Sequence, residues 1–166
     1  MKTIPIKNEN VDLCSPCGGH CCKWSPGTYL PDQLIKSDKD IKTQFEELLK
    51  TDKHVFVRSE YIEDKTAFKP KYYTVWTMRP KTKNSCSQYE YDNLGTCLNL
   101  TSDGCSLTFE DRPLECQKLI PDAVKCQYPE EWDTEKDIVQ KWLPYQGIIL
   151  NMNEEYWDKV PVQKSA

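Results

Sequence analysis

Thiols and an imidazole are concentrated near the start of the chain. Four cysteines and one histidine occur within nine residues, in the stretch Cys14-Ser-Pro-Cys17-Gly-Gly-His20-Cys21-Cys22. Such ligands bind zinc, copper(I) and iron in preference to magnesium or calcium. Cys14 and Cys17 have the CxxC spacing that lets two sulfur atoms occupy adjacent corners of a tetrahedron. Pro16 and the Gly18-Gly19 pair favour a chain reversal. This first block predicts one half of a metal site.

The other half is predicted far downstream, because four thiolates are difficult to converge from the first block alone. Cys97 and Cys105 flank Asp103-Gly104, a turn signal that would bring the two ends of a short hairpin together. Cys116 follows Arg112-Pro113, where a short helix is expected from about Pro113 to Leu119 with Asp111 as its cap. The predicted metal ligands are Cys14, Cys17, Cys21, Cys22, Cys97, Cys105, Cys116 and Cys126.

Cys21 and Cys22 are expected to serve different environments, because the side chains of neighbouring residues diverge. We expect Cys21 to join Cys14 and Cys17, and Cys22 to face the downstream block. Eight thiols exceed the four ligands of one zinc ion, so either two closed sites or one site with a buried structural thiol is predicted.

The interpretation of the nine cysteines depends on whether the protein lies in a reducing or an oxidising compartment. The N-terminus has no apolar signal segment, and no apolar run approaches the ~20 residues that span a bilayer. We therefore expect a cytoplasmic protein with no membrane partner. Disulfides rarely persist in that compartment, and an odd number of cysteines with a vicinal pair suits a disulfide framework poorly.

The cysteine pattern resembles a known family. Cys14-x-x-Cys17-Gly-Gly-x-Cys21-Cys22, followed by Cys97 and by Cys105 with Arg112-Pro113-x-x-Cys116, is similar to the YkgJ-type cysteine-cluster family, whose CxxCxxCC domain is described as zinc- or iron-chelating. The resemblance covers roughly residues 14 to 121, and Cys86 and Cys126 fall outside the core pattern. It implies metal binding. Flagellin lysine methylases carry a similar cysteine block, which keeps iron as an alternative.

Two functions from different classes follow. The first is a protein that binds zinc, or iron, through thiolates from both blocks. The second is an iron–sulfur protein with a [4Fe–4S] cluster, acting as a redox or protein-modification enzyme or its accessory. Zinc is favoured because the chain lacks the bacterial ferredoxin cysteine run. The sequence has no GxGxxG, P-loop or GxSxG motif, so no catalytic residue is predicted.

Other polar residues have alternative interpretations. His20 is either a nitrogen ligand or a turn residue beside the metal. Arg112 either hydrogen-bonds loop carbonyl groups or offsets the charge of a thiolate site. A basic aromatic ribbon, Phe68 to Lys83, invites comparison with single-strand binders, but the net charge of −4 makes a nucleic-acid partner an unfavoured expectation.

The elements that must position the cysteines follow from periodicity. Helical spacing of Ile41, Phe45, Leu48 and Leu49 predicts a helix after Asp38 or Asp40. Alternation over residues 54–63 and the β-branched and aromatic run 72–78 predict an antiparallel ribbon that Pro80 closes. Asp133 or Thr134 is expected to cap a helix, and Pro144 to begin another. The core face of the second is predicted to hold Tyr145, Ile148, Ile149, Met152 and Tyr156.

These elements predict a small α+β fold with a short antiparallel β-ribbon, flanking helices and metal-tied loops. The 166 residues are expected to form a single cysteine-cluster domain over 1–166, with a family-like core at about 14–121 and a helical part at about 133–159. With 38% hydrophobic residues and long loops, the core is poor. We therefore expect removal of a metal to abolish cooperative unfolding.

Overall fold

The computed structural model describes residues 18–62, 68–69, 72–124 and 126–160. Its elements are those of an α+β protein, as predicted, with helices around a small sheet. The element order is α2 (His20–Trp24), α3 (Pro31–Leu34), α4 (Ile41–Lys50), β1 (His54–Ile62), β2 (Tyr72–Pro80), β3 (Tyr89–Glu90), β4 (Leu100–Thr101), β5 (Gly104–Cys105), α5 (Leu114–Lys118), η1 (Glu135–Val139), α6 (Gln140–Trp142), η2 (Leu143–Tyr145) and α7 (Gln146–Lys159).

The predicted ribbon forms the centre of the fold. β1 and β2 pair antiparallel in a register that runs from His54 opposite Pro80 to Ile62 opposite Tyr72. β3 adds to the other edge of β1 in parallel, so the strand order is β2-β1-β3. Phe56 and Met78 lie opposite each other and are fully buried. Val55 alternates with Phe56 and is also buried, so both faces of this part of the ribbon are covered.

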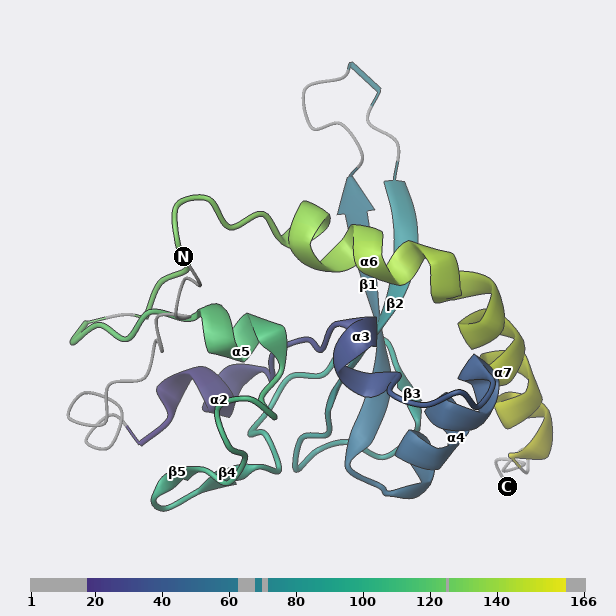
Figure 1. The fold of residues 1–166 in the computed structure, drawn as a ribbon, viewed down its shortest axis with the longest axis horizontal. Coiled ribbons are helices and arrows are strands. Elements are labelled where there is room, and N and C mark those ends of the chain that lie inside the picture. Colours follow the sequence, from purple (N-terminus) through teal and green to yellow (C-terminus); the bar gives the residue numbers. More distant parts are fainter. Residues whose placement is uncertain (1–17, 63–67, 70–71, 125, 161–166) are drawn as a thin grey trace, which may run out of the picture.

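Helices α4, α6 and α7 pack on the ribbon and enclose an aromatic core (Figure 1). Phe45 of α4 meets Phe56 edge-on at a centroid distance of 5.3 Å and stacks on Trp142 at 5.9 Å. The predicted stripe of the last helix faces this core. The buried cluster comprises Phe45, Leu49, Phe56, Val75, Trp76, Met78, Tyr89, Ile138, Val139, Trp142, Ile149 and Met152.

Side-chain hydrogen bonds fix the ends of the helices. Asp40 caps α4, as predicted, and its Oδ1 accepts a hydrogen bond from the backbone N–H of Thr43 at 2.9 Å. Asp133 Oδ1 accepts from the Glu135 N–H at 3.0 Å and so caps the C-terminal helical region. That region is less regular than predicted. It begins as a π-helical turn, and the 3₁₀ turn at Pro144 delays α7 until Gln146.

The start of α5 differs from the expected one. Pro113 occupies the cap position itself, and no side chain caps the helix. Asp111 bonds within its own turn instead, where its Oδ2 accepts a hydrogen bond from Thr108 Oγ1 at 2.8 Å. The five-residue helix still presents Cys116, as predicted. Among the described residues, the helices are all too short or too polar to cross a membrane.

Candidate metal centre

The described part of the first cysteine block begins with a tight turn into α2. Gly18 and Gly19 have φ values of 62° and 72°, in the left-handed region that favours glycine. The Cys22 N–H donates to the Gly19 carbonyl at 2.9 Å, which closes the first helical turn. A side chain at Gly19 would also collide with Leu100. Cys14 and Cys17 lie outside the described residues, as do the side chains of His20 and Cys21.

Backbone hydrogen bonds join the end of this block to the downstream cysteines. The Cys97 N–H donates to the Cys22 carbonyl at 2.8 Å, and the Gly95 N–H donates to the Trp24 carbonyl at the same distance. Cys97 is also bridged to Thr82, so it is fixed from two sides and is buried. The fold therefore brings the chain at Cys22 beside the chain at Cys97, across 74 intervening residues.

Cys105 lies at the end of the predicted hairpin. β4 and β5 pair antiparallel, with Leu100 opposite Cys105, and Gly104 has a φ of 107° in the turn. Leu100 is also the residue that Gly19 approaches. The hairpin therefore holds Cys105 near the turn of the first block, as Figure 1 shows for α2, β4 and β5.

Cys116 is placed by a second contact between the chain after the first block and the downstream cysteine region. A Cβ atom added at Gly27 would lie 2.5 Å from Cys116 Sγ, so only glycine permits this approach. Thr28 and Glu115 bond reciprocally: the Thr28 N–H donates to Glu115 Oε2 at 2.7 Å, and the Glu115 N–H donates to the Thr28 carbonyl at 3.4 Å. Residues 27–28 and 115–116 therefore form a close contact.

Tyr29 is a buried residue whose pKa depends on the downstream thiols. Burial raises its pKa, and negative charge on Cys116, Cys97 and Cys105 raises it further, followed by that of Asp111. The charges of these three thiols therefore all reach the phenol of Tyr29. Tyr29 was not predicted as part of the site. The available signal was its position seven residues after Cys22.

The described thiols do not complete a metal site by themselves. Within residues 18–62, 68–69, 72–124 and 126–160, no three His, Cys, Asp or Glu side chains are grouped so that they could hold an ion together. Cys22, Cys97, Cys105 and Cys116 thus do not form a closed four-cysteine centre.

Cys126 and Cys86 occupy other surroundings. Cys126 is half-buried beside the bridge in which Ile120 and Gln127 exchange backbone hydrogen bonds at 2.7 and 3.1 Å. This bridge follows α5, and Cys126 is not among the residues whose charge acts on Tyr29. Cys86 is exposed, and its N–H donates to Glu90 Oε1 at 2.9 Å. Cys86, which was not predicted as a ligand, therefore provides a control thiol.

Arg112 has the loop contact that was predicted. Its Nε donates to the Leu107 carbonyl at 3.4 Å, and its guanidinium carbon lies 5.8 Å from the centre of the Phe109 ring. It stabilises the turn between Cys105 and Cys116. Its proposed second role, offsetting thiolate charge, stays a prediction.

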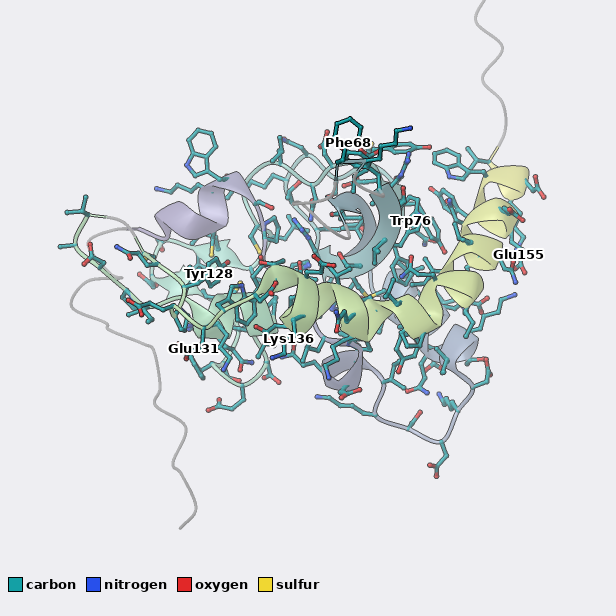
Figure 2. The ribbon with its side chains drawn as sticks, turned by 90° about the horizontal axis from the view of Figure 1, so that it is seen from above. Phe68, Trp76, Tyr128, Glu131, Lys136 and Glu155 are labelled. Carbon is teal, nitrogen blue, oxygen red and sulfur yellow. The ribbon has the colours of Figure 1, made fainter. Side chains whose placement is uncertain are left out.

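The basic aromatic ribbon does not form one continuous surface. Phe68 is almost fully exposed, whereas Trp76 is buried (Figure 2). Lys81 is buried and its Nζ pairs with Asp52 at 2.6 Å, and Arg79 donates to Ser25 Oγ at 3.1 Å. Two of the cations are therefore engaged within the fold.

Comparisons with known proteins identify no family for this chain. The resemblance to the YkgJ-type cysteine-cluster family therefore stays a prediction from the residues. Neither the family models nor the curated proteins nor the solved structures contain a match.

Proposed function

We propose that this protein binds zinc through thiolates from both cysteine blocks. The observation that carries the proposal is the hydrogen bond from the Cys97 N–H to the Cys22 carbonyl, which joins the two blocks. Because this bond joins the end of the first block to Cys97, it supports a ligand set drawn from both blocks. Soft, partly buried sulfur donors are the ligand type that zinc prefers.

The ligand set draws on both blocks. Cys22, Cys97, Cys105 and Cys116 supply the described thiols, and Cys14, Cys17 and Cys21 complete the coordination. Cys126 is a further ligand in the proposal, although its described surroundings give it the weakest support. A zinc ion with four protein ligands has no open position, so its role is to fix the surrounding loops. Metal-binding thiolates persist in a reducing compartment, so the proposal includes a cytoplasmic location.

Metal analysis of anaerobically purified protein, combined with a visible spectrum, tests the metal. Colourless protein with near-stoichiometric zinc supports the proposal. Brown protein with iron and labile sulfide would replace it with the iron–sulfur alternative, a [4Fe–4S] protein of redox or protein-modification chemistry. Protein that binds neither metal after reconstitution under reducing conditions would refute both.

Substitutions test the ligands. Cys14→Ser is expected to remove one equivalent of metal if there are two sites, and all of it if there is one. Cys116→Ser is expected to behave likewise, and the double variant distinguishes additive from all-or-none loss. Cys86→Ser is the matched control and is expected to retain full metal content. If neither Cys14→Ser nor Cys116→Ser changes metal content, joint binding by the two blocks is wrong.

Chelation tests how far the metal supports the fold. The buried aromatic cluster contains no cysteine. The sequence alone predicted that metal removal abolishes cooperative unfolding, and the cysteine-free core makes this expectation narrower. After chelation, amide hydrogen exchange should accelerate first in residues 18–30 and 95–118, and β1 and β2 should be affected less. Uniform acceleration through the ribbon would show that metal and core unfold as one unit.

A further inference from the structure

A pocket with a volume of ≈ 240 Å³ lies next to the candidate metal centre. Tyr29 lines it and is also the residue whose pKa the downstream thiols raise. Leu34 and Leu107 supply apolar walls. Pockets for drug-sized ligands usually measure about 300 to 1,000 Å³, so this one suits a smaller molecule.

Charges of both signs line the pocket, and they come from two chain segments. Lys36 follows α3, whereas Glu110 and Asp111 belong to the turn that precedes α5. Among the described residues, the Lys36 ammonium and the Glu110 carboxylate have no ion-pair partner. Asp111 uses Oδ2 to accept from Thr108, which leaves Oδ1 for another donor. The pocket thus combines a cation with two acceptor groups that still have bonding capacity.

Neutral polar rings form another part of the lining. His54 and Tyr29 meet with their ring centres 5.6 Å apart at an angle of 52°. His54 Nδ1 lies 3.3 Å from Thr51 Oγ1, which leaves Nε2 on the opposite edge of the ring. Burial lowers the pKa of His54, so the imidazole adds no positive charge near neutral pH.

Gln33 holds the two charged segments in place. Its Nε2 donates to the Arg112 carbonyl at 3.0 Å, and its Oε1 accepts from the Leu114 N–H at 2.9 Å. The same Oε1 accepts from the Leu30 N–H at 2.9 Å. Because this amide joins the backbone at both walls, the segments that carry Lys36 and Glu110 are held together before any ligand binds, which lowers the entropic cost of binding.

The lining offers a metal ion no ready ligand set, because no three described His, Cys, Asp or Glu side chains are grouped to hold one. A simple anion would meet two carboxylates, and a simple cation would meet Lys36. A ligand with both charges satisfies both walls.

We propose that this pocket binds a small zwitterion of the α-amino acid class. The ligand ammonium bonds to Glu110 and Asp111, the ligand carboxylate bonds to Lys36, and a short side chain packs against Leu34 and Leu107. This site goes beyond the proposed metal binding and does not depend on it, since none of these residues is a proposed metal ligand.

Isothermal titration calorimetry on the full chain tests the proposal with glycine, L-alanine and L-leucine, each up to roughly 10 mM. Their methyl esters lack the carboxylate charge, and their N-acetyl derivatives lack the ammonium charge. Lys36→Met and Glu110→Gln alter the two walls. Lys141→Met and Glu154→Gln, at exposed positions on α6 and α7, are the matched controls. Thermal unfolding and metal content are measured for every variant.

At least one of the three amino acids is expected to bind, and each blocked derivative to bind about tenfold more weakly or worse. Lys36→Met and Glu110→Gln are each expected to lose about tenfold or more, while the controls retain the affinity of the unmodified chain. The proposal is overturned if none of the three binds, if the blocked derivatives bind equally well, or if both pocket variants leave affinity unchanged. Because metal content is recorded separately, a failed metal proposal and a failed pocket proposal give different results.

Discussion

The contact between Gly27 and Cys116 makes a sharp prediction for Gly27→Ala. The added Cβ would lie 2.5 Å from Cys116 Sγ, 3.0 Å from the Cys116 backbone nitrogen and 3.2 Å from Glu115 Cβ. Two of these three atoms are not the ends of flexible side chains, so α5 must shift. Overpacking of this kind costs about 1 to 3 kcal/mol. For a chain of this size, each kcal/mol lowers the melting temperature by about 2 to 4 °C.

A second glycine provides a matched control. A Cβ at Gly147, in α7, would meet no atom within 4 Å. Gly147→Ala is therefore expected to stabilise the protein by up to about 1 kcal/mol through helix propensity. Both variants are compared by thermal unfolding at equal metal content. Equal stabilisation by Gly27→Ala and Gly147→Ala would refute the close approach of residues 27 and 116, and with it the placement of Cys116 beside the first block.

A double-mutant cycle separates the sulfur contact from the backbone contact. In a Cys116→Ala background the closest of the three atoms is gone, so the cost of Gly27→Ala is expected to fall. Because Cys116 is a proposed ligand, the cycle is measured on metal-free protein as well. An unchanged cost in the Cys116→Ala background would assign the strain to the backbone of α5.

Three further predictions concern the scaffold. Asp40→Ala is expected to lower the urea concentration at the midpoint of unfolding, because it removes the α4 cap, whereas exposed Asp38→Ala should have little effect. Gln146→Leu is expected to lower the free energy of unfolding by about 1 to 3 kcal/mol, because the Gln146 amide bonds the N–H and the carbonyl of Trp76 at 2.7 and 2.9 Å. Gln140→Leu, at an exposed position, is its control. Burial lowers the pKa of His54 from 6.5, so the unfolded chain binds the proton more tightly than the folded chain. The contribution of His54 to the free energy of unfolding should therefore be fully present above pH 6.5 and be lost as the pH falls below it. In His54→Gln this loss should be smaller.

Much of the scaffold was predictable because its signals are local. The spacing of Ile41, Phe45 and Leu49 defines α4, and alternation around Phe56 defines β1. β3 was not predicted, because two residues paired in parallel with β1 carry no periodic signal. The irregular turns around Pro144 were missed for a related reason: a proline predicts a helix start, and the sequence does not specify the π and 3₁₀ turns around it.

The candidate site was predictable as a set of residue types, and less so as a geometry. Cysteine spacing indicated which thiols belong together, and the Asp103-Gly104 turn indicated the hairpin that ends at Cys105. The role of Gly27 could not be predicted, because it depends on a contact with Cys116 across the chain. Tyr29 was missed for the same reason, since its neighbours are distant in sequence.

The fold separates the aromatic core, which stabilises the protein, from the segments that carry the cysteines. The aromatic core is built from α4, β1, β2, β3, η1, α6 and α7. The cysteine-bearing segments attach to it at two places, through the bridge between Cys97 and Thr82 and through the backbone of Tyr29. The Tyr29 N–H donates to the Met78 carbonyl at 3.0 Å, and Trp142 Nε1 donates to the Tyr29 carbonyl at 2.8 Å.

This attachment bears on how a metal would bind. Joining Cys22 to Cys97 requires closing a loop whose entropic cost grows with the logarithm of its length. The core and the Cys22–Cys97 hydrogen bond already close that loop. A metal bound here would therefore spend little of its binding free energy on ordering the chain, unlike the metal of a zinc finger, which must fold its domain. Tyr29 thus bonds to the core through its backbone while its side chain lines the proposed amino-acid-sized pocket.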